Sequence, residues 1–319
     1  RPTCLETPDV ASQATPTQLP ERPGEVIDRS TQISFTFDGT TYQAHPGDTI
    51  ASAMSAAGRR VFSRSFKYHR PRGLLCCAGQ CPNCLVQVGD EPNVRSCQRP
   101  VEAGMKVSAQ NVWPALDKDV MSLTGLADRF MPVGFYYKTF MRPRQLWPFY
   151  ERTLRKAAGL GVVDQDTPWG TFDKQYLHGE VAVVGGGPSG MRAALSAARA
   201  GARVLLFDTD PRLGGHLRWR PESDSVLAEL PQEVESNSHI EIFTNTTILG
   251  WYQDNWLAAV RGNRLFKIRA GAIVVATGTI EVPPLFDNND LPGVMLGSAV
   301  QRLLNLYGVS PGKRVVVVT

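Results

Sequence analysis

The stretch GLLCCAGQCPNCLVQVGDEPNVRSC, Gly73 to Cys97, holds five of the six cysteines in this chain of 319 residues. Four of them, Cys76, Cys81, Cys84 and Cys97, give the pattern C-x4-C-x2-C-x12-C. The first three match the spacing of the plant-type 2Fe-2S loop, in which a tight turn directs thiolates toward one pair of irons. Soft thiolates also bind zinc, so four cysteines satisfy either kind of metal centre.

A 2Fe-2S cluster is the predicted occupant of these four residues, and a structural zinc site is the alternative. Zinc sites usually consist of paired C-x2-C motifs, whereas here one loop and one distant cysteine provide the ligands. Cys77 would give the poorer spacing C-x3-C-x2-C, so we expect it to lie beside the cluster without binding it. Cys4 stands alone and is predicted to be an incidental thiol.

The segments around the cysteine loop predict an α+β fold of the β-grasp, 2Fe-2S ferredoxin-like type over residues 31–110. Residues 33–37 (ISFTF) alternate apolar and polar side chains, Asp38-Gly39 is a hairpin turn signal, and residues 40–44 return as a second strand. An Ala-rich helix follows, with Asp48 as its expected N-cap and Gly58 at its end. A further strand is predicted at residues 84–88.

From residue 179 to residue 319 the pattern changes to an α/β Rossmann-type FAD/NAD(P)-binding domain. Gly185, Gly187 and Gly190 follow a hydrophobic strand and open a helix, and Asp208 ends the next strand. The glycines permit a tight turn, the approach of a pyrophosphate and close packing of helix and strand. Asp208 would accept a hydrogen bond from a ribose hydroxyl, which favours NAD or FAD over NADP.

The predicted dinucleotide-binding residues come from the Gly-rich turn, from the end of the next strand and from two later loops. They are Gly185, Gly187, Pro188, Ser189, Gly190, Asp208, Thr209, Gly214, Gly215, Thr277 and Gly278. The alternatives are a Rossmann-like unit with an empty site and, for Thr277-Gly278, an ordinary turn between strand and loop.

A basic segment, RSFKYHRPRG, stands immediately before the cysteines. Its candidate residues for contact with an anion or a partner are Arg64, Lys67, Tyr68, His69, Arg70 and Arg72. Arginine binds carboxylates and phosphates through two parallel hydrogen bonds, and tyrosine and histidine add stacking. The alternative is a solvated charged face.

Composition and sequence pattern indicate the class of protein and the character of the remaining segments. With 42% hydrophobic and 20% charged residues the chain is typical of a globular protein, and a net charge of +4 with dispersed basic residues argues against nucleic acid as a partner. Residues 1–30 are predicted to be an irregular arm, and residues 111–178 a connector that packs between domains or subunits. No signal peptide and no membrane span are apparent, so the thiols predict a reducing compartment, the cytoplasm.

No set of residues predicts catalysis on a substrate. The five histidines, His45, His69, His178, His216 and His239, are scattered along the chain, and four cysteines are assigned to the cluster. We therefore expect that this chain contributes no catalytic residue and that the substrate reacts elsewhere.

Several segments together resemble the α subunit of heterotetrameric sarcosine oxidase. They are FDGTTYQAHPGDTIASAM, RSFKYHRPRG, GFYYKTFM, VVGGGPSG, ATGTIEVPPLFDNNDLPGVML and LLNLYGVSPGKRVVVV. The resemblance implies a β-grasp domain followed by an NAD site, and a chain that corresponds to about the first third of such a subunit. It also implies a β-type flavoprotein partner in which FAD oxidises an N-methyl amino acid, an FMN at the interface of the two subunits, and possible small subunits.

The four cysteines set this sequence apart from the sarcosine oxidases with a cysteine-free β-grasp domain. In this respect it is similar to cyanide synthase, opine oxidase and hydroxyproline dehydrogenase relatives, which combine a 2Fe-2S cluster with flavins. The resemblance therefore leaves NAD or FAD open at the Gly-rich turn, and oxygen or an electron carrier open as acceptor. Two other hypotheses are a self-contained NADH-dependent flavin and iron-sulfur reductase, and a zinc-stabilised scaffold subunit.

Overall fold

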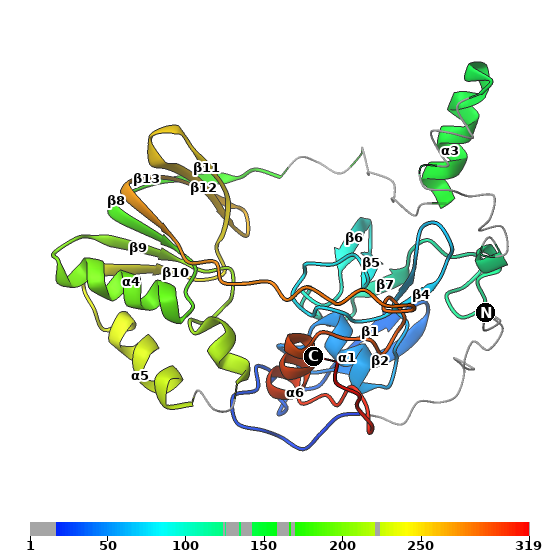
Figure 1. The fold of residues 1–319 in the computed structure, drawn as a ribbon, viewed down its shortest axis with the longest axis horizontal. Coiled ribbons are helices and arrows are strands. Elements are labelled where there is room, and N and C mark those ends of the chain that lie inside the picture. Colours follow the sequence, from blue (N-terminus) through cyan, green and yellow to red (C-terminus); the bar gives the residue numbers. More distant parts are fainter. Residues whose placement is uncertain are drawn as a thin grey trace. The chain divides into compact units, whose positions relative to one another are not determined.

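A computed structural model gives the structure of the chain, and it describes residues 17–123, 125, 134, 142–157, 166, 170–220 and 224–318. The chain divides into two compact units, residues 1–165 with 281–319 and residues 166–280 (Figure 1). Cys4 and most of the aromatic connector segment GFYYKTFM lie outside the described residues.

The first unit contains a five-stranded mixed sheet in the order β2-β1-β7-β5-β6 (Figure 1). Strands β1 and β2 form the predicted hairpin, β1 runs parallel to β7, and β5 pairs antiparallel with both β6 and β7. The elements of this unit are β1 Ile33–Phe37, β2 Thr40–Ala44, α1 Ile50–Ala56, β3 Ser63–Arg64, β4 Pro71–Arg72, β5 Leu85–Val88, β6 Glu91–Arg95, β7 Lys106–Ala109, the 3-10 helix η2 Arg144–Leu146, α3 Trp147–Ala157 and α6 Gly297–Tyr307.

Helix α1 begins with a capping box, which differs in one residue from the expectation. Thr49, not Asp48, is the N-cap, because the Thr49 hydroxyl accepts a hydrogen bond from the Ser52 amide and the Ser52 hydroxyl accepts one from the Thr49 amide. Asp48 instead accepts a hydrogen bond from the Ser52 hydroxyl and one from the His45 amide. Gly58 follows the helix with a positive φ, as expected for its end.

The second unit contains a six-stranded sheet in the order β10-β9-β8-β13-β12-β11. Strands β8, β9, β10 and β13 are parallel, and β11 and β12 add an antiparallel edge. The elements are β8 Asp173–Val184, α4 Pro188–Arg199, β9 Val204–Phe207, the 3-10 helix η3 Gly215–Trp219, α5 Asp224–Glu235, β10 Ile240–Phe243, β11 Thr247–Tyr252, the 3-10 helix η5 Gln253–Asn255, β12 Trp256–Arg261 and β13 Arg264–Val275.

Strand β9 shows why the VLLF run is apolar throughout. Val204 and Leu206 pack in a core with α4 and α5, whereas Leu205 and Phe207 pack in a second core with β12 and β13 on the other face. A parallel strand covered on both faces reads as a continuous apolar run. The doubly covered parallel sheet agrees with the predicted Rossmann-type domain.

The domain boundaries differ from the sequence-based ones at residues 281–319. The structure groups this segment with the first unit, although we expected one dinucleotide-binding domain over residues 179–319. Leu296, Ala299 and Leu303 are buried in the same core as the cysteine loop, and the Leu296 amide donates a 2.9 Å hydrogen bond to the Leu75 carbonyl. Strand β8 also starts at Asp173, inside the expected connector.

The described part of the N-terminal arm packs against its own chain. The Leu19 amide donates to the Gly308 carbonyl, the Val26 amide donates to the Leu306 carbonyl, and Gln18 forms a bridge with Val309. The described residues of the connector include the exposed side chains of Leu146, Trp147 and Phe149, and its packing against another subunit stays a prediction.

Candidate functional site

The cysteine loop lies between β4 and β5, and the β5–β6 hairpin brings the distant fourth cysteine to it. Leu85 pairs with Arg95 across the hairpin, and the Ser96 amide donates a 3.0 Å hydrogen bond to the Cys84 carbonyl. Cys84 and Cys97 flank these pairs, so twelve residues of intervening chain return the last thiol to the first three. The C-x12-C spacing is therefore the length of one hairpin.

The four predicted ligands contact one another through their sulfurs. Hydrogen bonds from the Cys81 and Cys97 thiols lower the pKa of Cys76, and backbone amides of Ala78 and Gln80 also donate to the Cys76 sulfur at 3.4 Å each. A hydrogen bond from Cys97 lowers the pKa of Cys84 to about 7. The pKa values of the two donors, Cys81 and Cys97, are raised, chiefly by these same hydrogen bonds. Cys76 and Cys84 are therefore the two sulfurs that favour the thiolate, which is the form that binds a metal.

These four residues fit an iron-sulfur cluster by donor chemistry and by burial. Cys76, Cys84 and Cys97 are at most 4% exposed, and Cys81 is the more accessible member. Cys81 and Cys97 each form a sulfur hydrogen bond with Cys76, and Cys97 forms a second one with Cys84. Among the described residues, no group of three His, Cys, Asp or Glu side chains is arranged to hold a single metal ion.

Cys77 has a different environment. It adopts a φ of 46°, which turns the chain between the two adjacent cysteines. Burial raises the pKa of the Cys77 thiol, and none of the other four thiols forms a hydrogen bond with it. An inert, buried thiol beside the cluster is what the spacing predicts for this residue.

The Gly-rich turn joins β8 to α4 in the second unit, and two of its glycines are required by backbone packing. A Cβ on Gly185 would lie 2.2 Å from the Ala276 carbonyl oxygen, and a Cβ on Gly190 would lie 1.8 Å from the Gly185 carbonyl oxygen. Gly185 also has a φ of 111°. These glycines allow the turn to lie against β13 and the helix to lie against the turn.

A Cβ on Gly187 would meet only an ordinary van der Waals contact, since the nearest atom, the Gly215 Cα, would be 3.9 Å away. Gly187 is the N-cap of α4 and provides no side chain to the first amides of the helix, and Pro188 follows it. Ser189 is exposed in the first turn, as are Thr277 and Gly278 after β13. The first amides of a helix, next to a residue without a side chain, fit a dinucleotide pyrophosphate.

Asp208 holds the Gly-rich turn. Its carboxylate accepts hydrogen bonds from the Gly186 amide and, at 2.7 Å, from the Asp210 amide. Burial raises the pKa of Asp208, and these amide bonds oppose the rise. The Gly214 amide also bonds the Gly186 carbonyl, whereas Thr209 is exposed. The end of β9 and the loop at Gly214 therefore both lie against the Gly-rich turn. A contact of Asp208 with a ribose stays a prediction.

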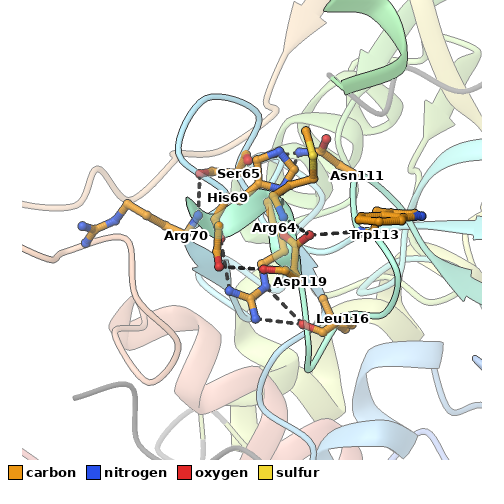
Figure 2. A network of polar contacts seen from close by, with 10 residues as sticks. Arg64, Ser65, His69, Arg70, Asn111, Trp113, Leu116 and Asp119 are labelled. Atoms are coloured by element: carbon orange, nitrogen blue, oxygen red, sulfur yellow. Dashed lines mark hydrogen bonds and ion pairs between the residues drawn. The ribbon is translucent and has the colours of Figure 1, made fainter. Parts of the chain in front are cut away.

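The basic segment is largely engaged within the chain (Figure 2). Arg64 donates to the carbonyls of Leu116 and His69, and the His69 ring lies 2.7 Å from the Asp119 carboxylate with both side chains almost fully buried. Arg70 and Arg72 both pair with Asp290, at 2.9 and 2.7 Å. Lys67 lies over the ring of Tyr68. Contact of this segment with an outside anion or partner stays a prediction.

Sequence reasoning missed the acidic residues that receive these cations. Asp119 and Asp290 lie 50 and 220 residues from His69 and Arg70. A carboxylate that distant carries no signal in the spacing of the basic segment. The only hint was that RSFKYHRPRG and NDLPGVM both contribute to the family resemblance.

Comparison with known proteins gives a family for each of the two sites. Residues 30–112 match the family described as 2Fe-2S iron-sulfur cluster binding domain, and residues 180–220 match the family described as FAD dependent oxidoreductase. These matches confirm the predicted order of a ferredoxin-like domain and a Rossmann-type domain.

Two curated relatives match almost the whole chain. The sarcosine oxidase subunit alpha of Rhizobium meliloti (strain 1021) is 40% identical over 95% of this chain and 33% of its own length. That of Corynebacterium sp. (strain P-1) is 34% identical over 97% of this chain and 30% of its own length. The chain thus spans about a third of the length of these relatives.

A solved structure shows the same fold. The L-proline dehydrogenase from P. horikoshii superposes with a TM-score of 0.62, at 22% identity, over 92% of this chain and 50% of that chain. In the part of the chain that the structure describes, no helix has the length and apolar character that would cross a membrane.

The ligand assignment predicts opposite outcomes for two neighbouring cysteines. Cys81→Ser removes a thiolate and is expected to abolish the visible absorbance of the cluster in the purified protein. Cys77→Ser is expected to keep it, because the Cys77 thiol forms no hydrogen bond with the other four thiols of the loop. Iron and acid-labile sulfide analysis provides the second measurement. A bleached Cys77→Ser protein with a coloured Cys76→Ser protein would show that the first ligand is Cys77.

Two glycines of the turn provide a matched test of the dinucleotide site. Gly187→Ala is expected to change the free energy of unfolding by less than about 1 kcal/mol, since its φ of −73° suits alanine, and to weaken dinucleotide binding about tenfold or more. Gly190→Ala overpacks the turn and is expected to destabilise the second unit by about 1–3 kcal/mol. Equal dinucleotide content in Gly187→Ala and wild-type protein would contradict the site.

The buried His69–Asp119 pair predicts a stability difference between two neighbouring aspartates. Asp119→Asn is expected to lower the free energy of unfolding of the first unit by about 3 kcal/mol, because it removes one partner of a buried pair. Asp117→Asn, at an exposed ion pair with Arg59, is expected to cost less than about 1 kcal/mol. Urea unfolding measures both, and equal costs would contradict a special role for Asp119.

Proposed function

The chain is a homologue of sarcosine oxidase α subunits, and from that premise we propose that it is the electron-transfer and dinucleotide-binding portion of an α-type subunit. The complex would be a flavin-dependent oxidoreductase that acts on the CH–NH group of a secondary or tertiary N-methyl amino acid such as sarcosine. The observation that carries the proposal is the contact among Cys76, Cys81, Cys84 and Cys97 in a domain that matches the 2Fe-2S family.

The cluster, when bound, supplies one-electron transfer between a flavin and an acceptor. The four cysteines would hold it, the Ala78 and Gln80 amides would stabilise negative charge on the Cys76 sulfur, and the surrounding apolar core would limit access of water. The Cys81 side is the more accessible one and would face the electron partner. The chain's own residues thus position and insulate the centre, and none is assigned to catalysis.

At the Gly185–Gly190 turn we assign FAD in preference to NAD, because residues 180–220 match the FAD-dependent family. The amides at the start of α4 would bind the pyrophosphate, and Gly187 would let it approach. Asp208 would position the turn through the Gly186 amide. NAD at this site is the other outcome of cofactor analysis.

The proposal includes partners that this chain does not contain. A β-type flavoprotein amine oxidase subunit would carry the FAD that receives the hydride of the amine, an FMN would lie at the interface of the subunits, and small subunits would complete the complex. The name "subunit alpha" of the relatives supports a multisubunit assembly. A cytoplasmic location is part of the proposal, because a reducing compartment keeps the free thiols available to iron.

The proposal predicts that an N-methyl amine reduces the cluster in the native complex. The purified complex is expected to contain about two iron and two sulfide per chain. Anaerobic sarcosine should produce the electron paramagnetic resonance signal of a reduced 2Fe-2S cluster, and glycine, which has no methyl group to lose, should not. Native mass spectrometry of the complex and its released cofactors identifies the subunits and distinguishes FAD from NAD.

Other results of this experiment would contradict the proposal in distinct ways. Rapid reduction of the isolated chain by NADH, with no response of the complex to sarcosine, would indicate the self-contained reductase. Zinc at about one per chain, with no iron, would indicate the scaffold subunit.

A further inference from the structure

Ser96 lies directly opposite one predicted cluster ligand and next to another. Leu85 pairs with Arg95 in the antiparallel β5–β6 hairpin, so the next position in the same register places Cys84 opposite Ser96. The Ser96 amide donates a 3.0 Å hydrogen bond to the Cys84 carbonyl, which shows that the pairing continues beyond the strand ends. Cys97 follows Ser96 directly in the chain. The backbone therefore fixes Ser96 between two of the four ligands.

The side chains of Cys84 and Ser96 share one face of the hairpin. Residues directly opposite each other in an antiparallel pair direct their side chains to the same face, with Cβ atoms about 4.5–5.5 Å apart. The exposure of the hairpin follows the same alternation, since Cys84, Val86, Val94 and Ser96 are all buried whereas Arg95 is exposed. The Ser96 hydroxyl and the Cys84 sulfur are thus neighbours on the face that packs in the core.

The Ser96 hydroxyl is a donor that the fold does not use. Both backbone groups of Ser96 are engaged, because its carbonyl accepts a 3.0 Å hydrogen bond from the Ala51 amide and its amide bonds Cys84. The residue has no exposed surface, and its hydroxyl completes no hydrogen bond in the part of the chain that the structure describes. By contrast, the buried Ser52 hydroxyl donates to the Asp48 carboxylate at 2.6 Å. A buried hydroxyl without an acceptor is unfavourable, so the Ser96 site favours a group that accepts its proton.

Cluster binding changes the donors available to the Cys84 sulfur. Among the protein's own groups the Cys97 thiol has the largest effect in lowering the pKa of Cys84 to about 7, and the Cys97 amide and the Ser96 hydroxyl act in the same direction. Cysteines bind iron as thiolates, so Cys97 gives up the proton that it donates to Cys84. The Cys97 amide and the Ser96 hydroxyl then remain as donors beside the Cys84 thiolate.

We propose that Ser96 is a positioning residue that acts through Cys84: its hydroxyl donates a hydrogen bond to the Cys84 thiolate and thereby raises the reduction potential of the cluster. Reduction adds one electron, and hence one negative charge, to the irons and their thiolates. A donor to a ligand sulfur stabilises this reduced form more than the oxidised form. The inference rests on the proposed binding of a 2Fe-2S cluster, and it assigns part of the control of its potential to a residue that is not a ligand.

The test is a redox titration of the cluster in the native complex, followed by electron paramagnetic resonance of the reduced state. In Ser96→Ala, the ratio of reduced to oxidised cluster at the wild-type midpoint is expected to fall about tenfold, equivalent to 59 mV for one electron. Ser96→Thr keeps a hydroxyl at this position and is expected to retain most of the wild-type potential. Iron and acid-labile sulfide analysis measures the cluster content of each variant.

Two other serines of the first unit provide matched controls. Ser52→Ala also removes a buried hydroxyl, but that hydroxyl bonds Asp48 and belongs to the capping box of α1. This variant is expected to unfold at lower urea concentration without a change in the midpoint potential. Ser108→Ala removes an exposed hydroxyl on β7 and is expected to change neither property.

Each result supports or overturns the inference. A midpoint in Ser96→Ala equal to that of wild type, with full cluster content, overturns it and leaves the proposed function intact. Equal shifts in Ser96→Ala and Ser52→Ala would indicate a general loosening of the core and would also overturn it. Loss of the cluster in Ser96→Ala would assign the hydroxyl to cluster assembly and overturn a role in the potential. Absence of a cluster in wild-type protein would instead contradict the proposed function itself.

Discussion

Contact among the sulfurs of four cysteines is the constraint on which the first unit depends. Closely packed buried thiols lose their protons only where a metal ion or hydrogen-bond donors compensate the negative charge. The structure supplies backbone donors to the Cys76 sulfur. The β5–β6 hairpin positions Cys84 and Cys97. The apolar core around three of the four thiols then keeps water away. The β-grasp sheet, α1 and α6 form the support that keeps the loop in place.

The charged residues near the cysteine loop mostly form ion pairs and hydrogen bonds within the first unit. Asp290 receives both Arg70 and Arg72, and it links the segment after the second unit to the strand that leads into the cysteines. Asp119 accepts hydrogen bonds from the amides of Trp113 and Met121 in addition to its contact with His69, so a buried carboxylate is fully surrounded by donors. Paired in this way, the basic segment stabilises a tertiary contact and is not simply a solvated face.

The second unit uses backbone geometry where the first uses side chains. Gly185 is required by its close approach to the Ala276 backbone and Gly190 by its close approach to the Gly185 backbone, whereas Gly187, the N-cap of α4, has no such close contact. A dinucleotide site of this kind depends on amides that the helix itself leaves free. The chain thus combines a cysteine cluster in a 2Fe-2S-type domain with a Gly-rich turn in a domain that matches the FAD-dependent oxidoreductase family, and the two features need different local chemistry.

The sequence by itself determined the features that depend on short spacing along the chain. The cysteine pattern, the β1–β2 hairpin and the glycine turn could be predicted because their residues are close in sequence and their chemistry is local. The place of residues 281–318 was decided only by the tertiary structure, because an amphipathic helix such as α6 can pack on any apolar surface, and which surface it covers depends on long-range contacts. The pairing of Arg70 with Asp290, 220 residues away, follows from that packing alone.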